Sequence, residues 1–360
     1  MSKEHGKEIV NLLQILKDTS DQQISSVSCD TGKLIRLAEM HRVTYPLLVY
    51  AQQHEGVFSG EQISQLDSRC RQNAQRSLVQ LHELTRMAIR LNETGIGYVC
   101  IKGPQLARMI YGREAFKESV DLDIMLVNQK DLSAIHDTLT GLGYTRSNLN
   151  NFKTACKRMI FLIAQREVHY FSRETRCAID LHVRPGANTY LTASRFRSIL
   201  SEVSLVDLEG TAIPVLPDEA YFVYLCYHGS LHQFSRLAWL QDIRAFLSLK
   251  RNLLDYEKLM IIARSLRTER GVYLAMLLLQ QYFGDEIPEQ LKKQIVISKR
   301  LNFLASVCHR MLLRDTGYGF TLHGRAGKLI YMMFLIKGFA GKIDLIYGIF
   351  MRFVVKRILR

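Results

Sequence analysis

Two aspartates lie close together in an apolar stretch of the chain. Asp121 and Asp123 are separated by one residue in the run 120–127, VDLDIMLV, which is otherwise aliphatic apart from one methionine. This composition predicts a buried β-strand, and because side chains alternate across a strand, both carboxylates point to the same face. Burying two ionised carboxylates side by side is costly unless a cation compensates them. The pair therefore predicts a site for a hard divalent ion such as Mg²⁺ (or Mn²⁺), which prefers oxygen ligands.

A third acid lies in a second strand-like run. Asp180 is part of the sequence 178–183, AIDLHV, again with apolar neighbours on the opposite face. Three acids on adjacent strands can hold metal ions, and one of them can take a proton from an attacking hydroxyl. His182 follows two residues later and shares the face of Asp180. It either lines the same site or is an ordinary sheet histidine.

A turn upstream of these acids has the features of a phosphate-binding turn. An apolar strand, 98–101, is followed by Lys102, Gly103 and a proline that suits the first turn of a helix. Backbone N–H groups at a helix N-terminus favour anions, Gly103 lets the backbone approach a ligand, and Lys102 adds a point charge. Each feature taken alone has a plainer interpretation. Such a turn is common without a ligand, and an Asp-x-Asp pair can simply lie at the solvated end of a strand.

The elements around these residues alternate between helical and strand periodicity. Helical spacing of apolar residues covers 5–92 and returns from 217 to about 315, with short strands between them. This order predicts an α+β fold, in which a small mixed β-sheet core with helices is flanked by N-terminal and C-terminal helical regions. We divide the chain into an N-terminal helical region (1–76), an α/β core (77–210), a C-terminal helical region (211–318) and a basic amphipathic tail (319–360).

The composition is that of a globular protein in a reducing compartment. Hydrophobic residues make up 48% of the chain and charged residues 23%, which is enough apolar material for a substantial core. The seven cysteines are dispersed without a Cys-x-x-Cys pair, and the N-terminus has no long apolar leader. These features predict a cytoplasmic protein with reduced thiols.

The positive charge is concentrated at the C-terminal end. The net charge is +14, and residues 321–360 contain eight Lys or Arg against one acid, Asp344. Segment 327–360 alternates apolar runs with basic residues, which predicts either an interfacial segment at the anionic inner face of a membrane or a helix pair packed on the domain. Nucleic acid is a third candidate partner for this segment.

Two histidines are spaced one helical turn apart. His228 and His232 lie on a predicted helix, with Trp239 and Asp242 further along. The spacing is compatible with zinc ligation together with Asp242, with a contact to nucleotide or acceptor, or with buried hydrogen-bonded packing. Trp239, the single tryptophan, is expected in the core, with stacking on a base as the alternative.

The order and spacing of these elements resemble a known family. The chain is similar to a bacterial uncharacterised nucleotidyltransferase family of the DNA polymerase beta-like nucleotidyltransferase superfamily, over roughly residues 30–290. The residues that carry the resemblance are CIKG (100–103), KESVDLDIMLV (117–127), IDLHV (179–183), LCYHGSLHQFSRLAWLQDI (225–243) and LIRLAEMHRVTYPLLVY (34–50).

The resemblance implies transfer of a nucleoside monophosphate from an NTP to an acceptor, with release of pyrophosphate. Asp121, Asp123 and Asp180 would ligate Mg²⁺. The nucleotide phosphates would lie near four further residues, Lys102, Gly103, Lys117 and Ser119. Lys117 occupies the position of a family arginine, and this replacement keeps the charge but loses bidentate phosphate recognition.

The acceptor is open at this point. A glycan precursor in surface-polysaccharide metabolism, a small molecule, a protein or an RNA would each suit a basic nucleotidyltransferase. One alternative function is that of a toxin which modifies RNA or protein. A second is that of a non-catalytic nucleotide-binding or scaffold protein, although three clustered carboxylates favour an enzyme.

Overall fold

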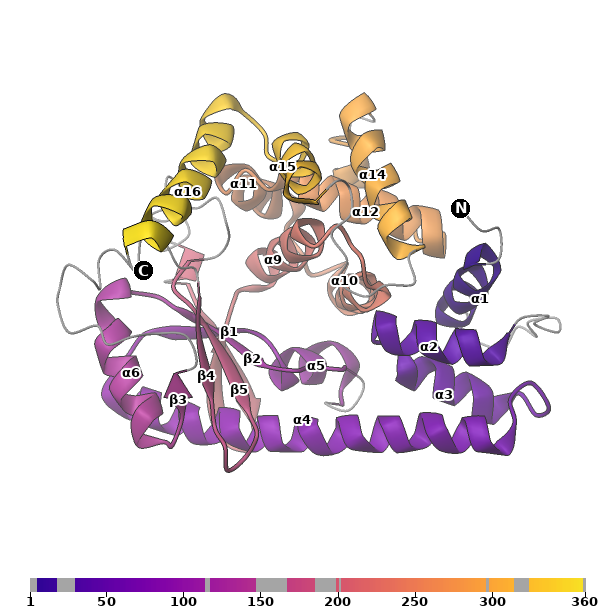
Figure 1. Cartoon of the computed structure of the whole chain (residues 1–360). Coiled ribbons are helices and arrows are strands. Elements are labelled where there is room, and N and C mark those ends of the chain that lie inside the picture. The colour runs from indigo at the N-terminus through magenta and orange to yellow at the C-terminus, as the bar shows by residue number, and fades with distance from the viewer. Residues whose placement is uncertain are drawn as a thin grey trace.

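The fold combines one mixed β-sheet with many helices, as Figure 1 shows for this computed structural model. It confirms the expected α+β class. The described residues are 5–17, 30–113, 117–146, 167–184, 199–200, 202–295, 298–313 and 324–358. The first residues of the expected tail, 319–323, lie outside them.

The N-terminal helices lead to one very long helix. They are α1 (His5–Lys17), α2 (Thr31–His41), α3 (Thr44–Gln53) and α4 (Gly60–Thr94). Helix α4 begins at a capping box, in which Ser59 and Gln62 satisfy each other's backbone N–H groups. It ends at Gly95, whose φ of 69° is the left-handed conformation that glycine adopts readily at a helix C-terminus. Helix α4 runs along one side of the sheet in Figure 1.

The sheet contains seven strands within the described residues, in the order β3-β4-β5-β2-β1-β7-β6. Strand β2 pairs in parallel with β5, and β1 with β7, while the other neighbours are antiparallel. The predicted strands around the three acids are therefore adjacent. The strands are β1 (Tyr98–Lys102), β2 (Leu122–Leu126), β3 (Thr145–Arg146), β4 (Glu167–Phe171), β5 (Ala178–His182), β6 (Ser204–Leu208) and β7 (Thr211–Val215).

Short helices connect the strands. The turn after β1 starts α5 (Pro104–Tyr111), and β2 is followed by the 3₁₀ turn η2 (Gln129–Asp131) and α6 (Leu132–Gly141). In Figure 1 α4 lies on one side of the sheet, and α9 (Asp218–Leu231) lies on the other. The central strands β1 and β2 are thus buried, which explains their nearly continuous apolar sequences.

The C-terminal helices pack around α9. Their bounds are α9 (Asp218–Leu231), α10 (Leu237–Lys250), α11 (Tyr256–Ser265), α12 (Glu269–Phe283), α13 (Glu289–Lys292), α14 (Lys299–Leu312), α15 (Gly324–Leu335) and α16 (Phe339–Ile358). Helix α9 is buried on nearly all sides, as expected of a central helix. A Cβ atom added at Gly229 would lie 2.2 Å from the Phe234 ring, so this close approach requires glycine.

The division into domains stays a prediction, and helix α4 and the β-sheet both extend across its boundaries. Helix α4 continues without a break through residues 76 and 77. Strand β7 belongs to the sheet although it begins after residue 210. No helix in the described ranges has the length and apolarity needed to cross a bilayer.

Candidate active site

One cross-strand row of polar side chains lies on the sheet face directed towards α9. Lys102 of β1 is in register with Asp123 of β2, Asp123 with Asp180 of β5, and Asp180 with His169 of β4. Residues directly opposite each other in a sheet share a face and lie close enough to interact. The sheet therefore brings together two of the expected acids and the expected lysine. The apolar residues between them point to the opposite face.

Asp123 is the most buried of the three acids, with 5% exposure. Its Oδ2 lies 2.8 Å from Nζ of Lys102, and its Oδ1 lies 2.7 Å from Nε2 of His182. Burial alone would raise the pKa of this carboxyl. The Lys102 ammonium and the His182 hydrogen bond outweigh burial, however, and hold the pKa well below its usual range. Asp123 is therefore a carboxylate at every physiological pH.

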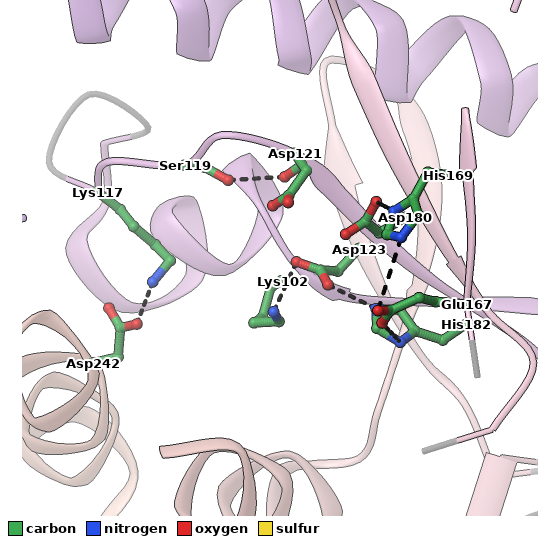
Figure 2. Close-up of polar contacts among 10 residues, drawn as sticks. All are labelled: Lys102, Lys117, Ser119, Asp121, Asp123, Glu167, His169, Asp180, His182 and Asp242. Atoms are coloured by element: carbon green, nitrogen blue, oxygen red, sulfur yellow. Dashed lines mark hydrogen bonds and ion pairs between the residues drawn. The ribbon is translucent and has the colours of Figure 1, made fainter. Parts of the chain in front are cut away.

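Asp180 forms a hydrogen bond with His169, which was not among the site residues predicted from the sequence. Nδ1 of His169 lies 2.5 Å from Oδ1 of Asp180, and this hydrogen bond is the main reason why the pKa of His169 is raised. Glu167 lies on the same strand face and approaches His169 at 3.9 Å and His182 at 3.6 Å (Figure 2). Strand alternation in 167–171 places Glu167 and His169 on one face, but only the pairing of β4 with β5 puts them beside Asp180.

Asp121 differs from the other two acids because its carboxylate is uncompensated. In the described parts of the chain its side chain makes no hydrogen bond or ion pair. Ser119 instead donates its hydroxyl hydrogen bond to the backbone carbonyl of Asp121, at 2.9 Å. Burial and the negative charges of Asp123 and Asp180 raise the pKa of Asp121 to about 6, against the weaker opposing effects of Lys102 and Arg42. The excess negative charge of the site is thus concentrated on Asp121.

The donor set suits a hard divalent cation. As the side chains lie, no three imidazole, thiol or carboxyl groups of the described residues converge closely enough to hold a metal ion. The acid cluster (Asp121, Asp123 and Asp180) nevertheless offers oxygen ligands only, which is the set preferred by Mg²⁺. A carboxylate has about four lone-pair directions, so Asp123 and Asp180 retain acceptor capacity beside their present partners. The unpartnered Asp121 carboxylate is the observation that supports a cation at this place.

The turn between β1 and α5 requires its glycine. Gly103 has a φ of 126°, and a Cβ atom added there would lie 3.0 Å from Oε1 of Gln105 and 3.4 Å from Cδ2 of Leu122. A side chain at this position would therefore be strained in both conformation and contact. The turn places the N-terminus of α5 directly after Lys102, at the edge of the acid cluster. This placement is compatible with the phosphate contact expected for Lys102 and Gly103.

Lys117 lies apart from the acid cluster. Its ammonium forms an ion pair with Asp242 of α10, and the side chains of these two residues are 11% and 5% exposed (Figure 2). Tyr111 donates a second hydrogen bond to Asp242, at 3.0 Å. The Lys117 charge is therefore already neutralised by a helix that lies far away in the sequence. As the side chains of the described residues lie, Asp242 does not converge with His228 and His232 on a geometry that could hold zinc.

The two helical histidines form an aromatic group with the tryptophan. The ring centroids of His228 and His232 are 4.7 Å apart, and Trp239 lies 5.6 Å from the first and 5.1 Å from the second. Burial, followed by the charge of Lys102, lowers the pKa of His228 well below its usual range. His228 is therefore neutral at physiological pH and close enough to Lys102 to sense its charge. Packing and site lining are both compatible with this position.

Comparison with known protein families identifies one that covers most of the chain. The model of a family described as an uncharacterised nucleotidyltransferase matches residues 28–284, a span that contains the acid cluster and the Lys117–Asp242 pair. No curated protein matches the chain.

Proposed function

Since the chain belongs to this uncharacterised nucleotidyltransferase family, we propose that it transfers a nucleoside monophosphate from an NTP to an acceptor in a Mg²⁺-dependent reaction. In this reaction the acceptor oxygen forms a bond to the α-phosphorus of the NTP. The bond from that phosphorus to the bridging oxygen of pyrophosphate breaks, and the acceptor hydroxyl loses its proton. The observation that carries the proposal is the acid cluster, in which Asp121 has no partner.

Each residue of the cluster has a role in this scheme. Asp121, Asp123 and Asp180 would hold Mg²⁺, which when bound neutralises phosphate charge and orients the phosphates. Lys102 fixes the Asp123 carboxylate and adds positive charge beside the phosphates. Asp180 would accept the acceptor proton on the oxygen that faces away from His169, and the His169 hydrogen bond orients it for that step.

The direct test is calorimetric titration with ATP, GTP, CTP and UTP in the presence of Mg²⁺. We expect saturable binding of at least one NTP by the wild-type protein and loss of that binding in Asp121→Asn, because an amide supplies no negative charge for the metal. Asp137→Asn is the matched control, since Asp137 is exposed on α6. An Asp121→Asn protein with full pyrophosphate release would refute the proposal.

A second proposal concerns where the enzyme works. Helix α16 exposes a row of large apolar side chains at spacings of three or four residues: Phe339 at 80%, Ile343 at 46%, Ile346 at 54%, Phe350 at 58% and Phe353 at 62%. Such spacing places them on one side of the helix. We propose that this α16 stripe (Phe339, Ile343, Ile346, Phe350 and Phe353) lies on the anionic inner face of a membrane.

Charge complementarity favours lipid over another protein surface. Residues 321–360 carry a single acid, Asp344, which is buried, whereas basic residues recur throughout the segment. A cytoplasmic enzyme held at a membrane would meet lipid-linked acceptors. This supports a glycan precursor of surface-polysaccharide metabolism ahead of a protein or RNA target.

Vesicle sedimentation tests the membrane proposal. We expect the protein to sediment with phosphatidylcholine vesicles that contain phosphatidylglycerol and much less with phosphatidylcholine alone. Ile346→Glu combined with Phe350→Glu should abolish this binding. Leu253→Glu, at a position that is 71% exposed elsewhere on the surface, should leave it intact. Equal sedimentation of all three proteins would contradict a role for the α16 stripe.

A further inference from the structure

Arg42 occupies an unusual backbone conformation at the end of α2. Its φ of 55° and ψ of 47° place it in the left-handed region, where its N–H caps the helix by bonding to the carbonyls of Ala38 and Glu39. Glycine adopts this conformation freely, whereas another residue costs about 1 kcal/mol. An arginine here therefore carries a backbone cost that glycine would not.

The Arg42 side chain is partly buried and uncompensated. Within the residues described, its guanidinium makes no hydrogen bond or ion pair. Its positive charge opposes the rise in the pKa of Asp121 that burial and the neighbouring carboxylates cause. Lys117 contrasts with it, because Asp242 already neutralises that cation. Within the described residues, Arg42 therefore carries a charge that remains able to bind an anion.

A cavity of about 540 Å³ adjoins Arg42. Arg42 and Val43 line one part of it, and Lys117 and residues of α10 such as Ala238 and Gln241 line another. The volume is within the range of small-molecule sites. The cavity therefore lies between the N-terminal helices and α10, and Lys117 connects it to the loop that leads into Asp121.

The other cations of this cavity have acidic partners. Arg244 Nε lies 3.1 Å and 3.0 Å from the two carboxylate oxygens of Asp285, and Arg251 lies 3.9 Å from a Glu286 oxygen. With Lys117 paired to Asp242, Arg42 is the cavity-lining cation without a partner in the described chain. An anionic group of a ligand would neutralise the charge of Arg42.

The position of Arg42 relative to the acids is fixed by contacts across the chain. Thr44, two residues after Arg42, donates a hydrogen bond of 2.6 Å to Glu118. Asn73 of α4 donates to the backbone carbonyl of Lys117 at 3.4 Å. The end of α2 and the loop before Asp121 are therefore tied together, which holds Arg42 in a fixed place relative to that loop.

We propose that Arg42 binds a phosphate group of the substrate and that the cavity beside it receives the phosphate-bearing part of that substrate. The proposal rests on the proposed function and deepens it. The planar guanidinium can donate two parallel N–H bonds to phosphate oxygens, which the ammonium groups of Lys102 and Lys117 cannot do.

Calorimetry with simple phosphate compounds tests the role of Arg42 without a nucleotide base or the natural acceptor. The full-length protein is titrated with magnesium tripolyphosphate, which reproduces the phosphate chain of an NTP, and with glycerol phosphate, which represents a phosphorylated acceptor. Arg42→Gly should weaken binding of the recognised probe at least about tenfold, equivalent to about 1.4 kcal/mol. Because glycine relieves the left-handed backbone, the variant should fold normally. Arg42→Lys should bind with intermediate affinity.

Arg176→Gly is the matched control. Arg176 has a φ of 54° and is exposed in the β4–β5 turn, so the same backbone relief occurs without loss of a site cation. Unchanged binding of both probes by Arg42→Gly, or no binding of either probe by the wild-type protein, would overturn the proposal. The probe that depends on Arg42 identifies whether donor or acceptor phosphate is bound.

The proposed nucleotidyl transfer and the proposed role of Arg42 fail in distinguishable ways. If no NTP is turned over but tripolyphosphate binding depends on Arg42, the proposed function fails and the phosphate site stands. If turnover depends on Asp121 while Arg42→Gly matches the wild type in both turnover and binding, the function stands and the role of Arg42 is refuted.

Discussion

Replacing Asp121 by asparagine should make the metal-free protein more stable while it removes activity. The Asp121 carboxylate is largely buried, lacks a partner in the described chain and faces two like charges, so its ionised form is unfavourable in the folded state. Asparagine keeps the shape and removes the charge. A residue needed for function would thus be a source of instability in the folded chain.

The magnitude follows from the pKa of Asp121. Its value of about 6 in the folded protein, against 3.8 for an ordinary aspartate, corresponds to about 3 kcal/mol, because one pKa unit is worth about 1.36 kcal/mol. A raised carboxyl pKa contributes stability that is fully present below pH 3.8 and is lost as the pH rises through about 6. The asparagine variant should therefore be about 3 kcal/mol more stable above that pH and nearly equal to wild type in acid.

Urea unfolding, followed by fluorescence of Trp239, measures this difference. Trp239 is the single tryptophan and lies on α10 beside His228, so its emission reports the helices that face the site. The free energies of unfolding of wild type and Asp121→Asn are compared across the pH range, without metal and then with Mg²⁺. Added Mg²⁺ should stabilise the wild type and not the variant, because it binds only the intact cluster.

Three outcomes would refute the reasoning. Equal stability of the two proteins at neutral pH would mean that the Asp121 carboxylate is compensated. A gain in stability that did not depend on pH would mean that its ionisation is not the cause. Equal stabilisation of both proteins by Mg²⁺ would place the metal elsewhere. Asp137→Asn, an exposed control on α6, should match wild type throughout.

Three further predictions test the architecture around the site. Asp242→Ala leaves the buried Lys117 ammonium unpaired and should lower the free energy of unfolding by about 3–5 kcal/mol. The double variant Lys117→Met with Asp242→Leu removes both charges and should recover most of that stability. An additive loss of stability in the double variant would contradict this prediction. Gly229→Ala forces a Cβ into the Phe234 ring and should cost at least about 2 kcal/mol, seen as a lower urea midpoint. Gly103→Ala strains the turn, where φ is 126°, and should lower the affinity for NTP more than it lowers the stability of the fold. If the variant binds NTP with the same affinity as the wild type in a calorimetric titration, the turn does not bind phosphate.

Local patterns in the sequence were sufficient to predict the strands that carry the acids. The runs around Asp121 and Asp180 form β2 and β5, and the helix before β1 ends at Gly95 as its sequence indicates. Alternation along a strand assigns a face to each side chain, and this assignment needs no tertiary information.

Partners that depend on strand pairing or on distant helices could not be predicted in this way. His169 meets Asp180 only because β4 pairs with β5 in one register, and a shift by one residue would turn it to the other face. Lys117 and Asp242 are 125 residues apart in the sequence, and neither residue type reveals the other as its partner. The left-handed conformation of Arg42 is likewise set by helix packing, since arginine has no preference for it.

The loop that leads into Asp121 has consequences for how the chain can be divided. Its contacts come from Thr44 on α3, Asn73 in the first half of α4 and Asp242 on α10, all outside residues 77–210. A fragment limited to the sheet region would lose all three anchors and would cut α4 in the middle. The sheet region with its acid cluster is therefore not a portable module: transplanting or excising it would require including helices from both ends of the chain.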